Sequence, residues 1–426
     1  MKMMIKSASS SFVVILTVVL LMIINIKLCV AIQNVNPIDG EEHRPLFRIA
    51  REGFFNFIGS NGDDEYSFQV NLKSGKLQRQ FKENEPFFCD TKNGPGRRSA
   101  TVPESVHKLR PGDIDIVGAF GDSLTAGNGA MAVNLLQIMT ENKGISWSIG
   151  GQGTWRKFLT LPNILKEYNP NLYGYSLSDG LSYHKNSKFN VAEIGAMSRD
   201  IPYMAKVLVK RIKADPKVDL KRHWKLITLL IGANDFCSDI CYYNQPETVL
   251  RAHEKYLLAA LRTLRDNLPR TIVNVVSAPD VTILLKFTKK PMECVPVHYV
   301  ECPCFFSSRF ENQRKRYLKI IRQWHEIDRQ ITDRDEFHNR TDFTVNLQPF
   351  TTKLRFPNNE EGSTDFRYMS MDCFHLSQRG YAIATNAYWN NIFEPYGNKS
   401  ETWKREFTEF KCPTNEMPYI RTKGNS

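Results

Sequence analysis

The sequence predicts an α/β fold in which a parallel sheet is covered on both faces by helices. Short apolar runs typical of buried strands alternate along the chain with longer segments of helical periodicity. Two of these runs end in glycine-containing turns, at Gly121–Ser123 and Gly232–Asp235. Strands and helices that alternate with short connections form parallel sheets, and ligands bind beyond the carboxyl ends of the strands. We therefore expect the functional residues in the turns that follow the strands.

Five strands and four long helices are expected. Apolar and β-branched runs predict strands over Ile114–Phe120, Lys188–Val191, Leu226–Ile231, Thr271–Val276 and Phe343–Leu347. Amphipathic periodicity predicts helices over Arg199–Ala214, Glu247–Asn267, Arg309–Ile331 and Ser377–Phe393. Ser377 is expected to cap the last of these helices. Because no internal repeat is visible, one main domain is the simplest division.

Residues 1–31 have the features of a secretory signal. Lys2 and Lys6 precede an apolar run over residues 12–26, and small residues that suit signal peptidase end at Ala31. The apolar run has about 15 residues, whereas a membrane-spanning helix needs roughly 20. We expect cleavage near Ala31, with an uncleaved membrane anchor as the alternative.

The rest of the chain divides into three parts. Residues 32–85 are polar and charged, without sustained periodicity, and predict an N-terminal extension or propeptide. The patterned sequence over residues 86–420 predicts the main domain, and residues 421–426 form a tail.

The chain is basic, but its cations are dispersed. The formal net charge is +12, and it falls to +9 when the three lysines of the predicted signal are removed. Local clusters such as Arg314–Arg316 fall on a predicted helix and are typical of a solvated surface. No nucleic-acid partner and no obligate protein partner is therefore expected.

The cysteines predict disulfides. One of the nine, Cys29, falls in the predicted signal, and an even number in a secreted chain is typical of disulfide bonding. The remaining eight are Cys89, Cys237, Cys241, Cys294, Cys302, Cys304, Cys373 and Cys412. A structural metal is the alternative for the closely spaced pairs, but no histidine pair accompanies them at zinc-finger spacing, so no metal is expected. Asn339 and Asn398 lie in sequons and are candidate glycosylation sites.

Ser123 is the candidate nucleophile. It follows an apolar strand in a glycine-containing turn, which would expose its side chain above the sheet. A serine hydroxyl needs an adjacent base, a group that orients this base, and donors for the oxyanion. Asp372 and His375 lie three residues apart just before a helix, so one loop could present the orienting carboxylate and the base. The alternative is a helix-capping aspartate beside a surface histidine.

Three groups are candidate oxyanion donors. They are the backbone N–H of Ser123, the unobstructed backbone N–H of Gly195, and the side-chain amide of Asn234. Each follows a different predicted strand.

The order of these blocks resembles that of the GDSL or SGNH hydrolases. The blocks are Gly-Asp-Ser at 121–123, Asn-x-x-x-x-Gly at 190–195, Gly-x-Asn-Asp at 232–235 and Asp-x-x-His at 372–375. Longer stretches resemble the phospholipase B branch of this family, and the resemblance covers roughly residues 86–420. These stretches are residues 105–111, 147–153, 161–165, 224–226 and 372–375.

The resemblance implies a flavodoxin-like, three-layer α/β/α sandwich with a five-stranded, mostly parallel sheet. It also implies a serine mechanism without a metal or other cofactor, in which Ser123 is the nucleophile, His375 the base and Asp372 its orienting group. The oxyanion donors would be Ser123, Gly195 and Asn234. Asp122 and Asp235 would brace their turns.

Two departures from the family pattern matter. Ala192 and Glu193 stand where many members have smaller or hydroxylated residues, so three other main-chain donors stay open: Gly150, Gly151 and Gly153. Membrane-anchored relatives have several repeats and a terminal anchor, whereas this sequence shows one unit. Release into the secretory lumen or the medium is therefore expected.

The implied function is that of a secreted phospholipase B or lysophospholipase. It would release fatty acids from glycerophospholipids at a membrane or micelle surface, through an acyl-enzyme on Ser123. The alternatives are an esterase acting on neutral acylglycerols, retinyl esters or acetylated sugars, and an inactive lipid-binding homologue. For the disulfides, our hypothesis pairs Cys89 with Cys412, Cys237 with Cys241, Cys294 with Cys302, and Cys304 with Cys373.

Overall fold

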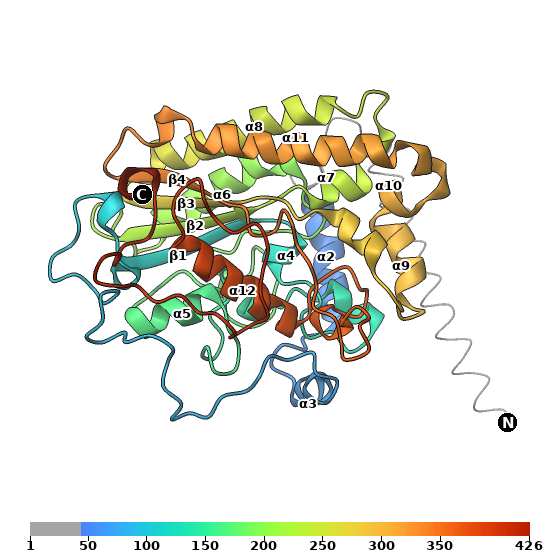
Figure 1. Ribbon diagram of the computed structural model, residues 1–426, viewed down its shortest axis with the longest axis horizontal. Coiled ribbons are helices and arrows are strands. Elements are labelled where there is room, and N and C mark those ends of the chain that lie inside the picture. Colours follow the sequence, from blue (N-terminus) through green and yellow to red (C-terminus); the bar gives the residue numbers. More distant parts are fainter. Residues whose placement is uncertain (1–43) are drawn as a thin grey trace. The chain divides into compact units, whose positions relative to one another are not determined.

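The computed structural model describes residues 44–426 (Figure 1). The predicted signal peptide, residues 1–31, lies outside the described residues, as do residues 32–43. The chain forms two compact units, Met1–Arg51 and Glu52–Ser426, and helix α2 (Arg44–Ile58) crosses their boundary. The sheet and all the predicted site residues belong to the second unit.

The second unit is built on a parallel sheet of four strands in the order β1-β2-β3-β4. The strands are β1 (Ile114–Gly121), β2 (Trp224–Leu230), β3 (Thr271–Val276) and β4 (Phe343–Gln348). Nearly every residue of these strands is buried, as expected where helices cover both faces. The predicted α/β class with a parallel sheet is confirmed.

The predicted fifth strand, Lys188–Val191, is not a strand. This segment joins β1 through a single parallel bridge between Ala119 and Asn190. Lys188 has a φ of +48°, which interrupts the extended conformation before a ladder can form. The segment thus lies beside the sheet edge, but contributes only two backbone hydrogen bonds to it: Ala119 N to Phe189 O and Val191 N to Ala119 O, both 3.0 Å.

Two helical layers enclose the sheet. Figure 1 shows α6, α8 and α11 above the sheet, with α5 and α12 below it. Apart from α2, the helices are α3 (Glu65–Lys73), α4 (Ser123–Ala126), α5 (Leu161–Tyr168), α6 (Ile201–Ala214), α7 (Ala233–Ser238), α8 (Thr248–Asn267), α9 (Cys294–Glu301), α10 (Pro303–Phe306), α11 (Arg314–Thr332) and α12 (Gln378–Ile392). The four predicted long helices correspond to α6, α8, α11 and α12. Ser377 caps α12 as predicted, because its hydroxyl accepts the N–H of Gly380.

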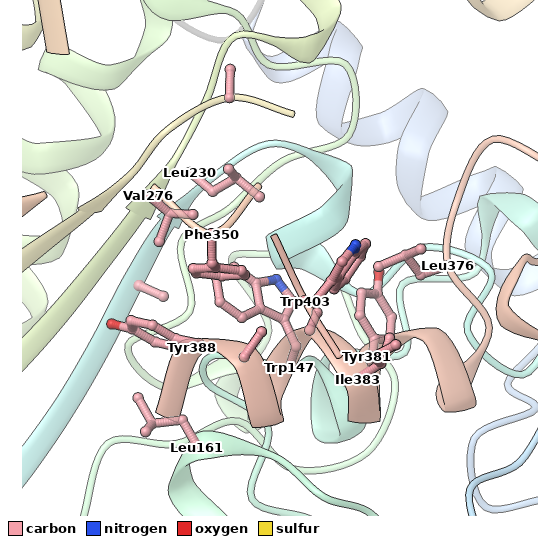
Figure 2. Close-up of a cluster of buried hydrophobic side chains, with 14 of the residues drawn as sticks. Trp147, Leu161, Leu230, Val276, Phe350, Leu376, Tyr381, Ile383, Tyr388 and Trp403 are labelled. Atoms are coloured by element: carbon pink, nitrogen blue, oxygen red, sulfur yellow. The ribbon is translucent and has the colours of Figure 1, made fainter. Parts of the chain in front are cut away.

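A large part of the core lies between α12 and the sheet (Figure 2). Trp147, Phe350 and Tyr388 pack together there, with ring centroids 5.2 to 6.0 Å apart. The Tyr388 hydroxyl also hydrogen-bonds to Thr228 of β2 and to Asn274 of β3, each at 2.8 Å. This buried polar contact fixes how α12 lies on the sheet, and therefore where the preceding turn is held.

The eight cysteines of residues 44–426 form four disulfides, Cys89–Cys412, Cys237–Cys302, Cys241–Cys304 and Cys294–Cys373. The predicted Cys89–Cys412 pair is confirmed. The other three predicted pairs, Cys237–Cys241, Cys294–Cys302 and Cys304–Cys373, are wrong. The tertiary packing of α7 against α10 sets Cys237 and Cys241 opposite Cys302 and Cys304, which leaves Cys294 for Cys373.

The segment before the main domain is hydrogen-bonded to it. The Asp179 carboxylate accepts the Ser60 hydroxyl and the backbone N–H groups of Asn61 and Gly62 at 2.7 to 2.8 Å. Gln378 accepts the N–H of Gln78 at 2.8 Å and donates to the Gln78 side chain at 2.9 Å. Within residues 44–426, no helix combines the length and apolar character needed to cross a membrane.

Candidate active site

Ser123 lies at the carboxyl end of β1, at the first position of α4. The turn before it is tight: Gly121 has a φ of +144°, and a Cβ there would lie 2.1 Å from the Leu230 carbonyl oxygen. Only glycine fits this approach. Asp122 then caps α4 by accepting the N–H of Leu124 at 3.0 Å. The N–H of Ser123 makes no hydrogen bond within the described residues, as is usual in the first turn of a helix.

His375 joins Ser123 to Asp372. Its Nε2 accepts the Ser123 hydroxyl at 2.8 Å, and its Nδ1–H donates to Asp372 Oδ2 at 2.5 Å. Asp372 Oδ1 also accepts the backbone N–H groups of Phe374 and His375, so the carboxylate closes its own turn. Burial alone would raise the pKa of Asp372. The His375 ring and these hydrogen bonds lower it by more, so the pKa lies below its ordinary value. Asp372 is therefore an ionised acceptor that sets the tautomer and direction of the imidazole.

Helix α9 supports this turn from outside. Cys294 is bonded to Cys373, His298 Nε2 lies 3.0 Å from the carbonyl of Cys373, and Glu301 Oε1 lies 3.9 Å from His375 Nδ1. The ligand atoms of Glu301, Asp372 and His375 all lie within 4.8 Å of one another, and among the described residues only this group could offer three ligands to a metal ion. His375 Nδ1 and Asp372 Oδ2 are already hydrogen-bonded to each other, so we assign no metal to the group.

Two of the predicted oxyanion donors, Asn234 and Gly195, come from neighbouring segments, a helix and a loop. Asn234, the second residue of α7, lines the same pocket as Ser123. Its Nδ2 donates one hydrogen to the carbonyl of Ala196 at 2.8 Å, which leaves the second hydrogen of the amide for another acceptor. Gly195 precedes Ala196 on an exposed loop with a φ of +71°, and its N–H makes no hydrogen bond within residues 44–426. Asn234 thus holds the loop that carries Gly195.

Two of the three alternative donors already donate to backbone carbonyls. The N–H of Gly150 donates to Ser146 and that of Gly151 to Ser176, each at 2.8 Å. Gly153 lies on an exposed loop, and its carbonyl oxygen accepts a hydrogen bond from Lys166 Nζ. None of the three glycines lines the pocket that contains Ser123, and neither does Gly195, so the pocket lining does not separate these candidates.

Asp122 and Asp235 brace turns, as the resemblance implied. Asp235 accepts the N–H of Ser198 at 3.0 Å, which ties the start of α7 to the loop that carries Gly195. Burial raises the pKa of Asp122 to about 7, against the opposing effect of its bond to Leu124. Burial also raises the pKa of Asp235 well above its ordinary value.

An apolar pocket opens beside Ser123. It contains about 780 Å³ of empty space, part of it open to solvent. Ser123 and Asn234 lie at its wall, and its other walls are mostly aliphatic and aromatic. Several of the lining side chains are drawn in Figure 2: Trp147, Leu230, Phe350, Leu376 and Trp403. Such a pocket suits a hydrocarbon chain whose reacting end reaches the serine.

A second Ser–His–Asp constellation lies in the same chain. Ser198 Oγ is 2.7 Å from His253 Nδ1, and His253 Nε2 is 2.8 Å from Asp328 Oδ1. All three side chains are buried, with relative exposures of 1 to 2%, and His253 stacks on Trp324. Because no substrate can reach Ser198, this network joins α8 and α11 to the loop of Gly195 as a structural support.

Sequence reasoning missed His253 and the contribution of α9. A signal for α9 was available, because Cys294, His298 and Glu301 are spaced four and three residues apart and so share one helix face. No comparable signal existed for His253, whose two partners lie 55 and 75 residues away along the chain.

The chain has relatives of described function. It is 39% identical over 337 residues to membrane-associated phospholipase B1 of Homo sapiens, covering 78% of this chain and 22% of the relative. It is 37% identical over 343 residues to that of Rattus norvegicus, covering 80% and 23%. The chain therefore spans less than a quarter of the length of these relatives. A solved phospholipase A1 of Streptomyces albidoflavus is 14% identical over 63% of this chain and 94% of its own, with a TM-score of 0.30, and we build nothing on it.

A family model described as GDSL-like lipase/acylhydrolase matches residues 117–388. This range is more than half of the chain and contains Ser123, Gly195, Asn234, Asp372 and His375. The chain belongs to the GDSL-like lipase/acylhydrolase family, a family of carboxylic ester hydrolases.

Proposed function

We propose that this chain is a serine ester hydrolase of the phospholipase B or lysophospholipase type. The observation that carries the proposal is the continuous hydrogen-bonded path from Ser123 through His375 to Asp372, beside an apolar pocket. The named activity of the relatives is consistent with it.

Each group has a role in the proposed mechanism. Ser123 Oγ attacks the ester carbonyl carbon while its proton passes to His375 Nε2, and Asp372 stabilises the imidazolium that forms. The N–H groups of Ser123 and Gly195 and the free amide hydrogen of Asn234 would stabilise the oxyanion. His375 then gives the proton to the departing glycerol oxygen, and water releases the fatty acid from the acyl-enzyme by the same steps in reverse.

We also propose that the chain is made in the secretory pathway and released there. Four disulfides indicate an oxidising compartment. Asn339 and Asn398 are exposed, as glycosylated asparagines must be. Mass spectrometry of the secreted protein tests cleavage near Ala31 and both glycosylation sites.

The activity test uses the two serines that hydrogen-bond to histidine. Fatty acid and glycerophosphocholine release is measured from diacyl phosphatidylcholine and lysophosphatidylcholine, with triacylglycerol, retinyl ester and an acetylated sugar in parallel. Ser123→Ala should abolish release and fluorophosphonate labelling, whereas Ser198→Ala, the matched control, should keep both. Undiminished hydrolysis by Ser123→Ala excludes the proposed nucleophile. Preference for a neutral ester, or failure of the wild type to be labelled, favours a different substrate or an inactive lipid-binding protein.

A further inference from the structure

An unusual exposed surface lies beside the candidate active site. Within the described residues, five large apolar side chains between residues 285 and 300 are exposed to solvent, with Met292 at 88% and Tyr299 at 53%. The others are Leu285, Val295 and Val300. Three exposed or half-exposed lysines, Lys286, Lys289 and Lys290, are interspersed with them. We call the segment Leu285–Val300 the α9 surface.

Helix α9 has two different faces. Cys294, His298 and Glu301 point to the turn that carries Asp372 and His375, as their contacts show. Val295 and Tyr299, four residues apart, lie on the outer face of the helix. A soluble helix normally turns polar residues outward, so this outer face indicates a partner that takes up apolar side chains.

The α9 surface borders the mouth of the apolar pocket. The 3₁₀ helix Val281–Lys286 supplies three pocket residues and continues directly into the α9 surface. A second hollow, lined by Lys286, Lys353 and Arg355, shares Phe356 and two other wall residues with the pocket. In Figure 1, α9 lies beyond the carboxyl ends of the strands, on the side of α4. Cations and apolar groups therefore surround the entrance.

We propose that the α9 surface, with Lys353 and Arg355, binds this chain to a phospholipid surface that contains anionic lipid. The proposal rests on the proposed function, since the substrate would then enter the pocket from the bound membrane. Apolar side chains can insert among the acyl chains while the lysines contact lipid phosphates. Four acids reduce this charge in part. Asp280 lines the second hollow and accepts two hydrogen bonds from Thr282, and Glu293 is exposed. Glu361 pairs with Lys289, and Glu401 pairs with Lys353.

The test measures binding without turnover. The Ser123→Ala chain is floated with vesicles of phosphatidylcholine alone and of phosphatidylcholine with phosphatidylserine, so the result does not depend on the chain being active. Val295→Ser with Tyr299→Ser should weaken binding to both vesicles roughly tenfold or more. Val102→Ser, an exposed valine before β1 at the other end of the sheet, is the matched control and should bind like the parent.

A charge-matched pair of variants completes the test. Changing Lys286, Lys289 and Lys290 to Gln should weaken binding to the phosphatidylserine vesicles by roughly fivefold for each lysine. The same change at three exposed lysines before β2 should have no comparable effect; these are Lys213, Lys217 and Lys221. Unchanged vesicle binding by the α9 variants overturns the proposal. So does a concentration-dependent dimer of the parent that these variants abolish, because the surface would then bind a second copy of the chain.

A separate observation concerns Glu301. Its Oε1 lies 3.9 Å from His375 Nδ1, and its carboxyl group lies within 4.8 Å of the Asp372 carboxylate. We infer that Glu301 is a positioning residue that holds Asp372 and His375 in place from the end of α9. Burial, and next the neighbouring Asp372 carboxylate, raise the pKa of Glu301 well above its ordinary value. A neutral carboxyl group can donate to ionised Asp372 without competing for the imidazole.

Two variants separate this role from a merely structural one. Glu301→Gln keeps a neutral donor and should retain kcat and the pH profile of kcat/KM for a soluble ester, whereas Glu301→Leu should lower kcat roughly tenfold or more with little change in KM. The other titratable groups that act on Asp372 and His375 are unchanged in both variants; these are Asp122, Lys76, His298 and Tyr381. An acid limb moved to lower pH by Glu301→Gln would show an ionised Glu301 and overturn the inference. Full activity in Glu301→Leu would do the same.

Discussion

The disulfide between Cys294 and Cys373 joins α9 to the turn that carries both Asp372 and His375. Cys373 itself has a φ of +55°, a region that non-glycine residues adopt only where surrounding contacts hold them. The carbonyl oxygen of Cys373 is hydrogen-bonded to the His298 ring. The Asp372 side chain accepts the backbone N–H of His375 within the same turn. The position of the candidate base thus depends on a residue about 80 positions earlier in the chain.

Removing this disulfide should lower activity more than its effect on stability explains. In the double variant Cys294→Ala with Cys373→Ala, the freed turn should lower kcat roughly tenfold or more. The free energy of unfolding should fall by about 2–4 kcal/mol. Denaturant unfolding and hydrolysis of a soluble ester measure the two effects. The matched control, Cys89→Ala with Cys412→Ala, should lose stability but keep kcat, and equal kcat losses in both would contradict this role.

Replacing Asp372 by Asn should preserve the turn but not the chemistry. The amide oxygen can still accept backbone N–H groups, but it no longer stabilises the imidazolium or fixes the tautomer of His375. We expect kcat/KM for a soluble ester to fall by roughly 10³–10⁴-fold. Asp266→Asn, which removes an exposed ion pair with Arg265, is the control and should stay close to wild type. A small effect of Asp372→Asn would assign the orienting role to another group.

Asp122 should make stability depend on pH. Its pKa is raised from 3.8 to about 7 in the folded protein, so between these values the folded state keeps a proton that the unfolded chain has lost. The free energy of unfolding must therefore fall as the pH rises through this window. Asp122→Asn cannot ionise, so its stability relative to wild type should increase across the window by up to roughly 4 kcal/mol. Urea unfolding at several pH values measures this difference, and a constant offset would exclude the effect.

The segment before the main domain should contribute to stability. Residues 32–85 were predicted to be an extension or propeptide, and this stays a prediction. A chain that begins at residue 86 leaves the buried Asp179 carboxylate without three of its donors, from Ser60, Asn61 and Gly62. Compared with a chain that begins at residue 44, it should lose at least roughly 3 kcal/mol of unfolding free energy. Equal thermal stability of the two chains would show that the segment is removable.

Local sequence was enough to predict much of the sheet and the candidate site. The runs at β1 to β4 are short, buried and rich in apolar and β-branched residues, so the sequence alone was enough to predict them as strands. Lys188–Val191 was wrongly predicted as a strand. So short a run becomes a strand only when a neighbouring strand pairs with it over several residues, and the sequence does not show whether such a partner exists. The structure offers it only one bridge.

The sequence by itself determined the parallel fold and the candidate groups Ser123, Asp372 and His375, because short-range signals encode them. Ser123 follows an apolar strand and a glycine turn, and Asp372 lies three residues before His375. Only the tertiary structure decided three disulfide pairings, the support of the turn by Glu301, and the burial of Ser198 with His253. Each of these depends on which helices pack together, and contacts between residues dozens of positions apart leave no local pattern to read.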